Sequence, residues 1–179
     1  MDYPWFELKE NSADITQGDI IKGCFVPILK EFDISKNEQN VKAEISTIDG
    51  IVLTQACDIA NNKVENIILC AITSKSDFEA NQKNAGKNEK QIKRDIEGII
   101  RGQQHAYHII NEYKTEEFSQ DYYIISFKEI YSVPVEVARV FAQKNGKRLR
   151  LCPPYREHLS QAFARYFMRV GLPINIHVE

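Results

Sequence analysis

Cys57, Asp58, His105 and His108 are the residues whose types and spacing could support catalysis in this sequence. A cysteine attacks a substrate as its thiolate, which needs a nearby base or positive charge. An arrangement of Cys57, His108 and Asp58 would supply a histidine base and a carboxylate that orients it. The alternative is structural: Cys57 packs, Asp58 caps a turn and His108 is half-buried. We favour the structural alternative, because the charge of Asp58 disfavours a thiolate beside it.

The spacing of the two histidines bears on both catalysis and metal binding. If the segment around them extends as a strand, His105 and His108 face opposite sides, and only His108 is expected to enter a shared site. A zinc site would combine Cys57 with one histidine and a carboxylate, but no compact ligand pair is present, so we predict no metal site. The sequence also lacks a Walker loop, G-x-G-x-x-G, H-E-x-x-H and G-x-S-x-G. We therefore expect no cofactor.

The composition is that of a folded domain. The 179 residues are 43% hydrophobic and 27% charged, with a net charge of −2, which argues against disorder and a wholly cationic surface. No apolar run approaches the ~20 residues of a membrane span, and the N-terminus lacks the pattern of a secretory signal. The four cysteines are widely spaced, with Cys24 and Cys70 inside apolar runs where cysteine acts as a small hydrophobe. We expect one cytoplasmic domain spanning residues 1–179, with no membrane partner.

The first half of the chain reads as short strands separated by turns. Asp49-Gly50 is a typical tight-turn pair between two apolar runs. Runs rich in Ile and Val predict four adjacent strands of one curled sheet or small barrel: Asp19–Leu29, Val41–Ile48, Ile51–Gln55 and Val64–Thr73. With later strands at 106–110, 122–127, 130–133 and 148–151, barrel strands are expected over about 17–74 and 105–151.

Two helices are expected outside these strands. Isoleucines at helical spacing predict a helix over Glu89–Arg101, within a helical insertion at about 85–103. Pro153-Pro154 suits the start of a second, amphipathic helix over Tyr155–Val170, within about 154–171. We expect Phe163 and Phe167 on its apolar face to be buried. The other interpretation of that face is a docking surface for another chain.

The C-terminal part of the chain is locally basic. Between Phe141 and Leu172, seven basic residues stand against one acidic residue, so the rest of the chain carries an excess of about eight negative charges. This asymmetry indicates an anionic partner, RNA or DNA, although a solvated face or a protein partner would give the same pattern. The candidate nucleic-acid-binding residues are Arg148, Arg150, Arg156, Arg165 and Arg169.

Three segments together resemble a known family. Gln17–Ile21 (QGDII), Ile51–Gln55 (IVLTQ) and Ile67–Ser74 (IILCAITS) are similar to the G-D-I start, the apolar middle strand and the apolar strand ending in Thr-Ser of the PemK/MazF toxin superfamily. The resemblance covers about 40% of the chain. It implies an α+β domain built on an SH3-like β-barrel. In ribonuclease members a threonine of the Thr-Ser motif acts in catalysis, and Thr73 falls on that position.

These features predict a small cytoplasmic bacterial protein of toxin or phage-defence type, acting as a nucleic-acid-binding or partner-binding module. The partner would be RNA or DNA at the basic region, another protein, or a second copy of the chain. Two alternatives remain from other classes. One is an enzyme, either a PemK-like endoribonuclease or one dependent on Cys57 and His108; the other is a structural subunit of a multiprotein complex.

Overall fold

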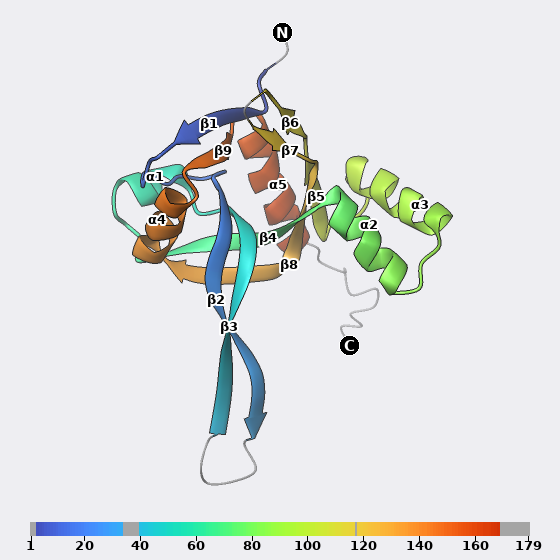
Figure 1. Ribbon diagram of the computed structural model, residues 1–179, viewed down its shortest axis with the longest axis horizontal. Coiled ribbons are helices and arrows are strands. Elements are labelled where there is room, and N and C mark those ends of the chain that lie inside the picture. Colours follow the sequence, from blue (N-terminus) through green and yellow to red (C-terminus); the bar gives the residue numbers. More distant parts are fainter. Residues whose placement is uncertain (1–2, 34–39, 117, 169–179) are drawn as a thin grey trace, which may run out of the picture.

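A five-stranded antiparallel sheet forms the centre of the computed structural model, which describes residues 3–33, 40–116 and 118–168. Its strands pair in the order β2 (Ile20–Asp33), β3 (Asn40–Val52), β4 (Asn66–Ser74), β8 (Tyr123–Pro134) and β5 (Tyr107–Ile110). Within the described part of the chain no pairing joins β5 back to β2, so the sheet is not closed into a barrel. The expected α+β class is confirmed, and the sheet is strongly curled in Figure 1.

Two small sheets flank the central one. β1 (Phe6–Glu10) pairs with β9 (Lys147–Leu151), and β6 (Tyr113–Lys114) pairs with β7 (Ser119–Gln120). A bridge between Asp19 and Arg150 ties β9 to the beginning of β2. The N-terminal strand is therefore joined to a strand from the C-terminal third of the chain (Figure 1).

Five helices surround the sheet: α1 (Ala56–Ala60), α2 (Lys75–Asn84), α3 (Glu89–Ile100), α4 (Val135–Lys144) and α5 (Tyr155–Phe167). In Figure 1, α1 and α4 lie at one end of the sheet, α2 and α3 at the other, and α5 beside its centre. Among the described residues, no helix is both long enough and apolar enough to cross a membrane.

The Asp49-Gly50 pair is not a turn, and this corrects the strand prediction. Both residues lie inside β3, which covers the expected strand Val41–Ile48 and continues into the second expected strand as far as Val52. The Asp49 carboxylate accepts a hydrogen bond of 2.8 Å from the Gly23 amide, beside a register shift in β2. A Cβ on Gly50 would lie 3.3 Å from the Cys70 carbonyl oxygen, so this glycine permits close approach of β4 rather than a reversal of the chain.

The helix predictions succeeded where an apolar face was strong. α3 matches the expected helix, with Ile92, Ile96 and Ile99 buried and an Asn88–Gln91 capping box at its start. α2 was not among the expected helices, and Phe78 is its one buried side chain. α4 was not expected, and its buried residues include Ala138 and Phe141.

The C-terminal helix confirms one part of its prediction and contradicts another. Leu159 is fully buried, whereas Phe163, which was also expected to be buried, is half-buried with its ring centroid 5.6 Å from that of Phe127. Phe167 is 61% exposed, so the expectation that it is buried is wrong. The described helix ends at Phe167, and Val170 lies outside the described residues. The contact of the helix with the core extends from its first turn to Tyr166.

Burial of the cysteines follows the prediction for two of the four. Cys24 and Cys70 are fully buried in the apolar interior. Burial raises the pKa of the Cys70 thiol to about 12 and also raises that of Cys24, because the interior disfavours a thiolate. Both residues therefore act as small hydrophobic side chains.

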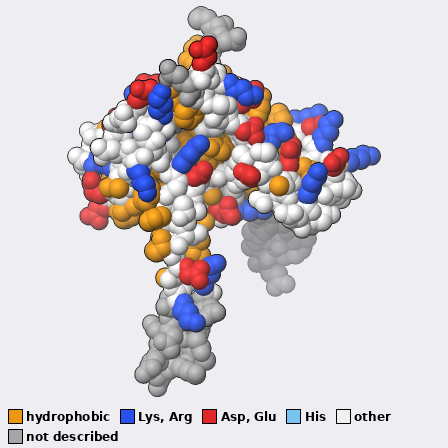
Figure 2. Space-filling view, viewed as in Figure 1, with side chains coloured by type: hydrophobic (Ala, Val, Ile, Leu, Met, Phe, Trp, Pro, Cys, Tyr) orange, Lys and Arg blue, Asp and Glu red, His pale blue; other side chains and the backbone are white. Residues whose placement is uncertain are grey.

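The outer parts of β2 and β3 form a two-stranded arm that projects from the body (Figure 1). β4 pairs with β3 only at residues 50–52, whereas β2 and β3 pair from Cys24↔Ile48 outward to Asp33↔Asn40. Phe25, Leu29 and Ile45 are exposed on the arm, and Figure 2 shows hydrophobic side chains over its upper part. Val26 is buried at the base against the α4 side. Packing of Val26 in the core therefore holds the base of the arm to the rest of the protein.

Candidate functional site

Cys57 and His108 lie in different parts of the molecule. Cys57 is exposed on α1, with its Sγ 3.6 Å from Oδ1 of Asp58. His108 lies on β5 opposite Ile125 of β8, and Figure 1 places α1 and β5 toward opposite ends of the sheet. The structure therefore brings Cys57 and Asp58 together but does not bring His108 to them.

Thr73 lies on β4 in a setting that is unfavourable for phosphate. It pairs with Ile124 of β8 and lines a cavity of about 430 Å³. Three carboxylates, those of Asp49, Asp77 and Glu129, line the same cavity, and the described lining includes no lysine or arginine. Negative charge of this kind repels the phosphate of a nucleic acid.

Arg148 and Arg150 form an interior ion-pair network with Asp19. The Asp19 side chain is fully buried and that of Arg148 is 1% exposed. Nε of Arg150 donates to Oδ1 of Asp19 at 2.5 Å, and Nε of Arg148 donates to Oδ2 at 3.2 Å. Arg148 also donates to the carbonyl oxygens of Ser12 and Asp14. The network fastens the segment before β2 onto β9.

This network removes two residues from the predicted nucleic-acid-binding set. Burial works against the charged form of Arg150, but the hydrogen bond and charge of Asp19 outweigh it and raise the pKa of Arg150. Arg148 has its guanidinium turned to Asp19 and to backbone carbonyls. The positive charges of Arg148 and Arg150 therefore balance the buried carboxylate of Asp19.

Other basic residues of the C-terminal region also have local partners. Arg156 pairs with Glu157 at 2.9 Å, Lys147 pairs with Glu10 at 3.3 Å, and the Lys144 amine lies 5.8 Å from the Phe141 ring centroid. Arg165 is exposed and lines a pocket. Arg169 lies outside the described residues. Of the predicted residues, Arg148 and Arg165 each line a cavity with other polar groups, and the guanidinium of Arg148 is already paired with Asp19.

That cavity, the His–Arg pocket, is the candidate site. It has a volume of about 540 Å³ and lies between the end of α3, β5 and α5. Its polar lining comprises His105, His108, Asn111, His158, Gln161 and Arg165, and its aromatic lining comprises Trp5, Tyr107 and Tyr122. A pocket of this size, with a few convergent polar groups on an apolar wall, is typical of a ligand site.

The local backbone explains why two histidines reach the same pocket. His105 precedes β5 in a turn in which the Tyr107 amide donates to the Gln104 carbonyl at 2.9 Å. The alternation of a strand therefore does not apply between His105 and His108. The expectation that only one of them enters a shared site is wrong.

The pocket is electrostatically suited to an anion. Burial, together with the charges of His158 and Arg165, lowers the pKa of His108 to about 4. His108 is therefore neutral at pH 7 and offers one N–H donor and one ring-nitrogen acceptor. No carboxylate occurs among the described residues that line the pocket. Arg165 thus contributes a positive charge that no acidic group within the pocket offsets.

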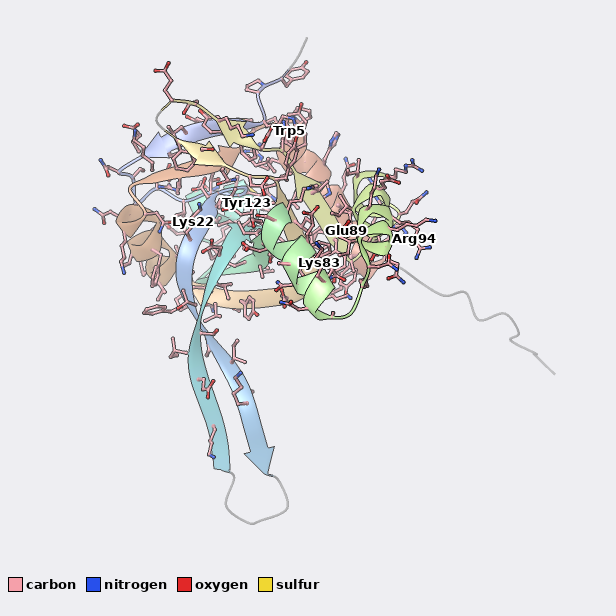
Figure 3. The ribbon with its side chains drawn as sticks, turned by 45° about the vertical axis from the view of Figure 1, so that its right-hand side comes forward. Trp5, Lys22, Lys83, Glu89, Arg94 and Tyr123 are labelled. Carbon is pink, nitrogen blue, oxygen red and sulfur yellow. The ribbon has the colours of Figure 1, made fainter. Side chains whose placement is uncertain are left out.

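The aromatic wall adds a flat apolar surface. The ring of Trp5 stacks on that of Tyr155, with centroids 3.6 Å apart and an interplanar angle of 11°. This stacking fixes Trp5, labelled near the top of Figure 3, beside the first turn of α5. Aromatic faces of this kind bind nucleobases by stacking.

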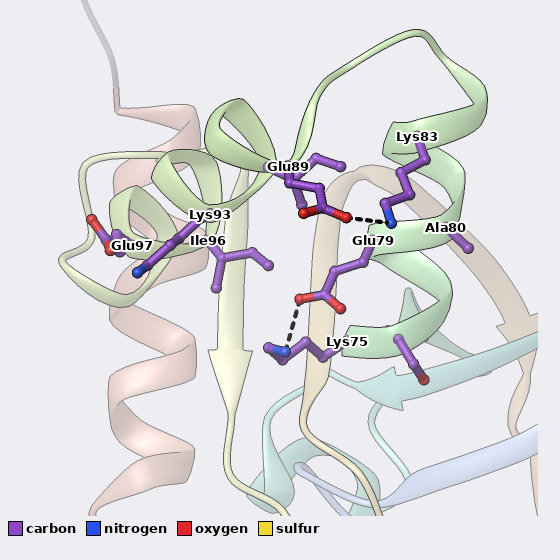
Figure 4. Close-up of a pocket in the computed structure, with 10 residues that line it drawn as sticks. Lys75, Glu79, Ala80, Lys83, Glu89, Lys93, Ile96 and Glu97 are labelled. Atoms are coloured by element: carbon purple, nitrogen blue, oxygen red, sulfur yellow. Dashed lines mark hydrogen bonds and ion pairs between the residues drawn. The ribbon is translucent and has the colours of Figure 1, made fainter.

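A larger cavity lies between α2 and α3, and its chemistry differs (Figure 4). It has a volume of about 650 Å³, with Ile92 and Ile96 on one side. Lys75 pairs with Glu79 at 2.8 Å, and Lys83 pairs with Glu89 at 3.0 Å. Lys93 and Glu97 also line this cavity, so its described lining holds three lysines and three glutamates, whereas that of the His–Arg pocket holds no carboxylate.

The described residues hold no cluster of three or more His, Cys, Asp or Glu side chains that could bind a metal ion. The three histidines of the His–Arg pocket therefore line one cavity without meeting at a common point. Their arrangement suits contacts spread over a ligand, because a metal site needs its ligands within a single coordination sphere.

Comparison of the chain with protein-family models, with curated proteins and with solved structures gave no match. The geometry and chemistry of the chain itself therefore carry the functional argument.

Sequence reasoning missed His158, Gln161 and Trp5 as members of the site. On α5, His158, Gln161, Ala162 and Arg165 follow the i, i+3, i+4, i+7 spacing of one helix face. This pattern was a usable signal, because it places a histidine, an amide and an arginine on one stripe. Trp5 gave no such signal, since the β1–β9 pairing brings it to α5 from the other end of the chain.

Proposed function

We propose that the protein is a nucleic-acid-binding module that holds one nucleotide of its ligand in the His–Arg pocket. The observation that carries this proposal is a single cavity with three histidines, Arg165 and three aromatic residues, and with no carboxylate in its described lining. Arginine is well suited to phosphate because its planar guanidinium can donate two parallel hydrogen bonds.

The geometry supports a specific division of labour. His158, Gln161 and Arg165 occupy one face of α5, so a phosphate at this face meets a charged donor and an amide together. His108, neutral at pH 7, contributes a hydrogen bond without demanding a counter-charge. Trp5, Tyr107 and Tyr122 provide ring faces for the base.

The wider biological role follows the family resemblance and is part of the same proposal. We infer a cytoplasmic bacterial protein of toxin or phage-defence type whose curled sheet is an opened relative of the SH3-like barrel. The antiparallel neighbours β2, β3 and β4 support this inference, since β4 contains one resembling segment and β2 and β3 each include two residues of another. Ribonuclease chemistry of the PemK type has less support, because acidic residues line the cavity beside Thr73.

The test uses the single tryptophan of the chain as its reporter. Trp5 lines the pocket, so its fluorescence should change when a single-stranded RNA or DNA oligonucleotide binds. We expect Arg165→Ala and His158→Ala each to weaken binding by about tenfold or more, which corresponds to about 1.4 kcal/mol. We also expect affinity to fall as salt rises, because bound phosphate releases counterions.

Arg139→Ala is the matched control. Arg139 lies on α4, pairs with Glu136 at 2.6 Å and does not line the pocket, so its loss should leave binding unchanged. Equal effects of Arg139→Ala and Arg165→Ala would show that binding depends on general surface charge and not on the His–Arg pocket. Absence of binding to RNA and DNA at low salt would refute the proposal.

A further inference from the structure

A second, smaller cavity contains a buried side chain without a hydrogen-bond partner. Gln120, on β7, is 5% exposed, and neither its amide oxygen nor its amide nitrogen has a partner among the described residues. Leaving a buried amide unpaired costs free energy, so most such groups in folded proteins are paired with protein, water or ligand. Gln120 therefore needs an explanation.

The cavity beside Gln120 is larger than a water site. Its volume is about 210 Å³, with Ile20 and Leu149 on its apolar side and Phe118, Lys22 and Lys147 completing much of its lining. A water site needs only about 10–15 Å³ of such space, so this cavity is far larger than one water requires. A single bridging water would satisfy the amide but leave most of the cavity unfilled.

Asn145 shows that the unpaired state of Gln120 is specific. It carries the same amide group and lines the same cavity. Its Oδ1 accepts from the Lys22 amide at 2.8 Å, and its Nδ2 donates to the Lys22 carbonyl at 3.0 Å. The fold pairs both ends of the Asn145 amide and leaves both ends of the buried Gln120 amide without a partner among the described residues.

A cation and an aromatic ring lie beside the unpaired amide. The Lys22 amine is 6.0 Å from the ring centroid of Phe118 and 5.8 Å from that of Tyr123. Figure 3 shows Lys22 and Tyr123 near each other at the beginning of β2. No carboxylate lines the cavity in the described part of the chain. An amide that both donates and accepts, a ring and an ammonium group together match a planar heterocycle with an anionic substituent.

We propose that this cavity binds the adenine ring of a nucleotide, with the Gln120 amide paired to the amino group and neighbouring ring nitrogen of the base. Glutamine pairs with adenine in this two-bond manner in nucleic-acid recognition. Phe118 supplies a stacking face, and Lys22 meets the phosphate. The choice of a nucleobase as ligand rests on the proposed function, whereas the unpaired amide and the cavity are observations that do not depend on it.

The experiment is a titration of the full chain, labelled with ¹⁵N in its glutamine side chains, with adenosine monophosphate. The amide signal of Gln120 reports on this cavity, and that of Gln161 reports on the His–Arg pocket. We expect a saturable shift of the Gln120 signal. Gln120→Met should weaken the calorimetric binding that accompanies this shift by about tenfold or more. The matched control, Gln161→Met, should leave the Gln120 shift intact.

Three further arms make the outcome decisive. Uridine monophosphate should shift the Gln120 signal at least about tenfold more weakly than the adenine nucleotide, and inorganic phosphate should leave the signal in place. Comparing the mononucleotide with an oligoadenylate distinguishes a free nucleotide from a strand as the source of the base. Phe118→Leu is a second variant, to be used if Gln120→Met does not fold. It should weaken binding because it removes the stacking face.

An unmoved Gln120 signal at millimolar nucleotide overturns the inference, as does an equal response to the uridine nucleotide or to phosphate. If the Gln161 signal moves while that of Gln120 does not, the His–Arg pocket keeps its proposed function and this cavity does not bind adenine. If the Gln120 signal alone moves, the proposed function of the His–Arg pocket fails and this inference stands.

Discussion

Asp19 is the residue on which the interior of the protein depends most directly. Its buried carboxylate balances two guanidinium groups, Arg148 and Arg150. Removing one member of a buried ion pair leaves the others charged without a counter-charge, which is much costlier than losing a surface pair. The same three residues therefore matter for stability and are not available for a ligand.

We expect Asp19→Asn to lower the free energy of unfolding by about 3–5 kcal/mol, because it leaves Arg148 buried without its carboxylate. Urea denaturation of both proteins measures this change. The control is Asp14→Asn, since the Asp14 side chain is 77% exposed and lies 3.8 Å from Arg150; its loss should cost less than about 1 kcal/mol. Equal effects of the two substitutions would contradict the interior role of Asp19.

His108 makes stability depend on pH in a defined direction. Its folded-state pKa is about 4, against an ordinary value of 6.5. Between these values the unfolded chain takes up a proton that the folded chain does not, so stability should fall as pH is lowered from 6.5 toward 4. At about 1.4 kcal/mol per pH unit, the loss reaches at most about 3 kcal/mol.

The variant His108→Asn tests this directly, because asparagine keeps a polar group and does not titrate. Denaturation at pH 7.5, 6 and 5 should show a smaller loss of stability for the variant than for the parent chain. Identical pH profiles would show that His108 does not resist protonation in the folded protein.

At the scale of elements, α5 has two ends with different roles. Leu159 is fully buried in the core and Phe167 is 61% exposed at the last turn. Leu159→Ala should therefore lower the free energy of unfolding by about 2–5 kcal/mol, through lost burial and the cavity it leaves. Phe167→Ala should change it by about 0.5 kcal/mol or less. Thermal and urea unfolding distinguish the two, and a larger loss for Phe167→Ala would contradict this assignment.

Elements with a regular apolar period were predictable, and those held by distant contacts were not. α3 and the strand character of β2, β4 and β9 follow from local spacing of isoleucine, valine and leucine. β3 was divided in two because Asp49-Gly50 has the composition of a turn. Only the partner strand shows why it continues, since Asp49 bonds to Gly23 across the pair.

The sequence indicated only some residues of the candidate site, for a related reason. His108 and Arg165 were both singled out, but for separate functions, and the structure places them in one pocket. Arg148 and Arg165 are both basic residues with an apolar or aromatic neighbour in the sequence. They differ because Asp19, which lies 129 residues before Arg148 in the chain, forms a buried ion pair with Arg148. No local pattern carries that information.

At the scale of the whole molecule, both proposed sites are composite. The His–Arg pocket takes Trp5 from the N-terminal end, His108 from the middle and Arg165 from the C-terminal helix. The smaller cavity takes Lys22 from β2, Gln120 from β7 and Leu149 from β9. Neither can exist in a fragment, so both depend on the pairing of β1 with β9 and on the Asp19 network that stands next to it.

The β1–β9 pairing also dictates when during synthesis the protein can reach its final form. A ribosome makes the chain from its N-terminus, so Phe6–Glu10 and Asp19 leave it long before Lys147–Leu151 exist. Until then the first strand has no partner and Asp19 has neither arginine. The part of the chain that is made before β9 therefore stays incompletely folded during synthesis and is accessible to chaperones and proteases. A chain cut short before β9 would therefore be removed as unfolded polypeptide and would not persist as a partly active product.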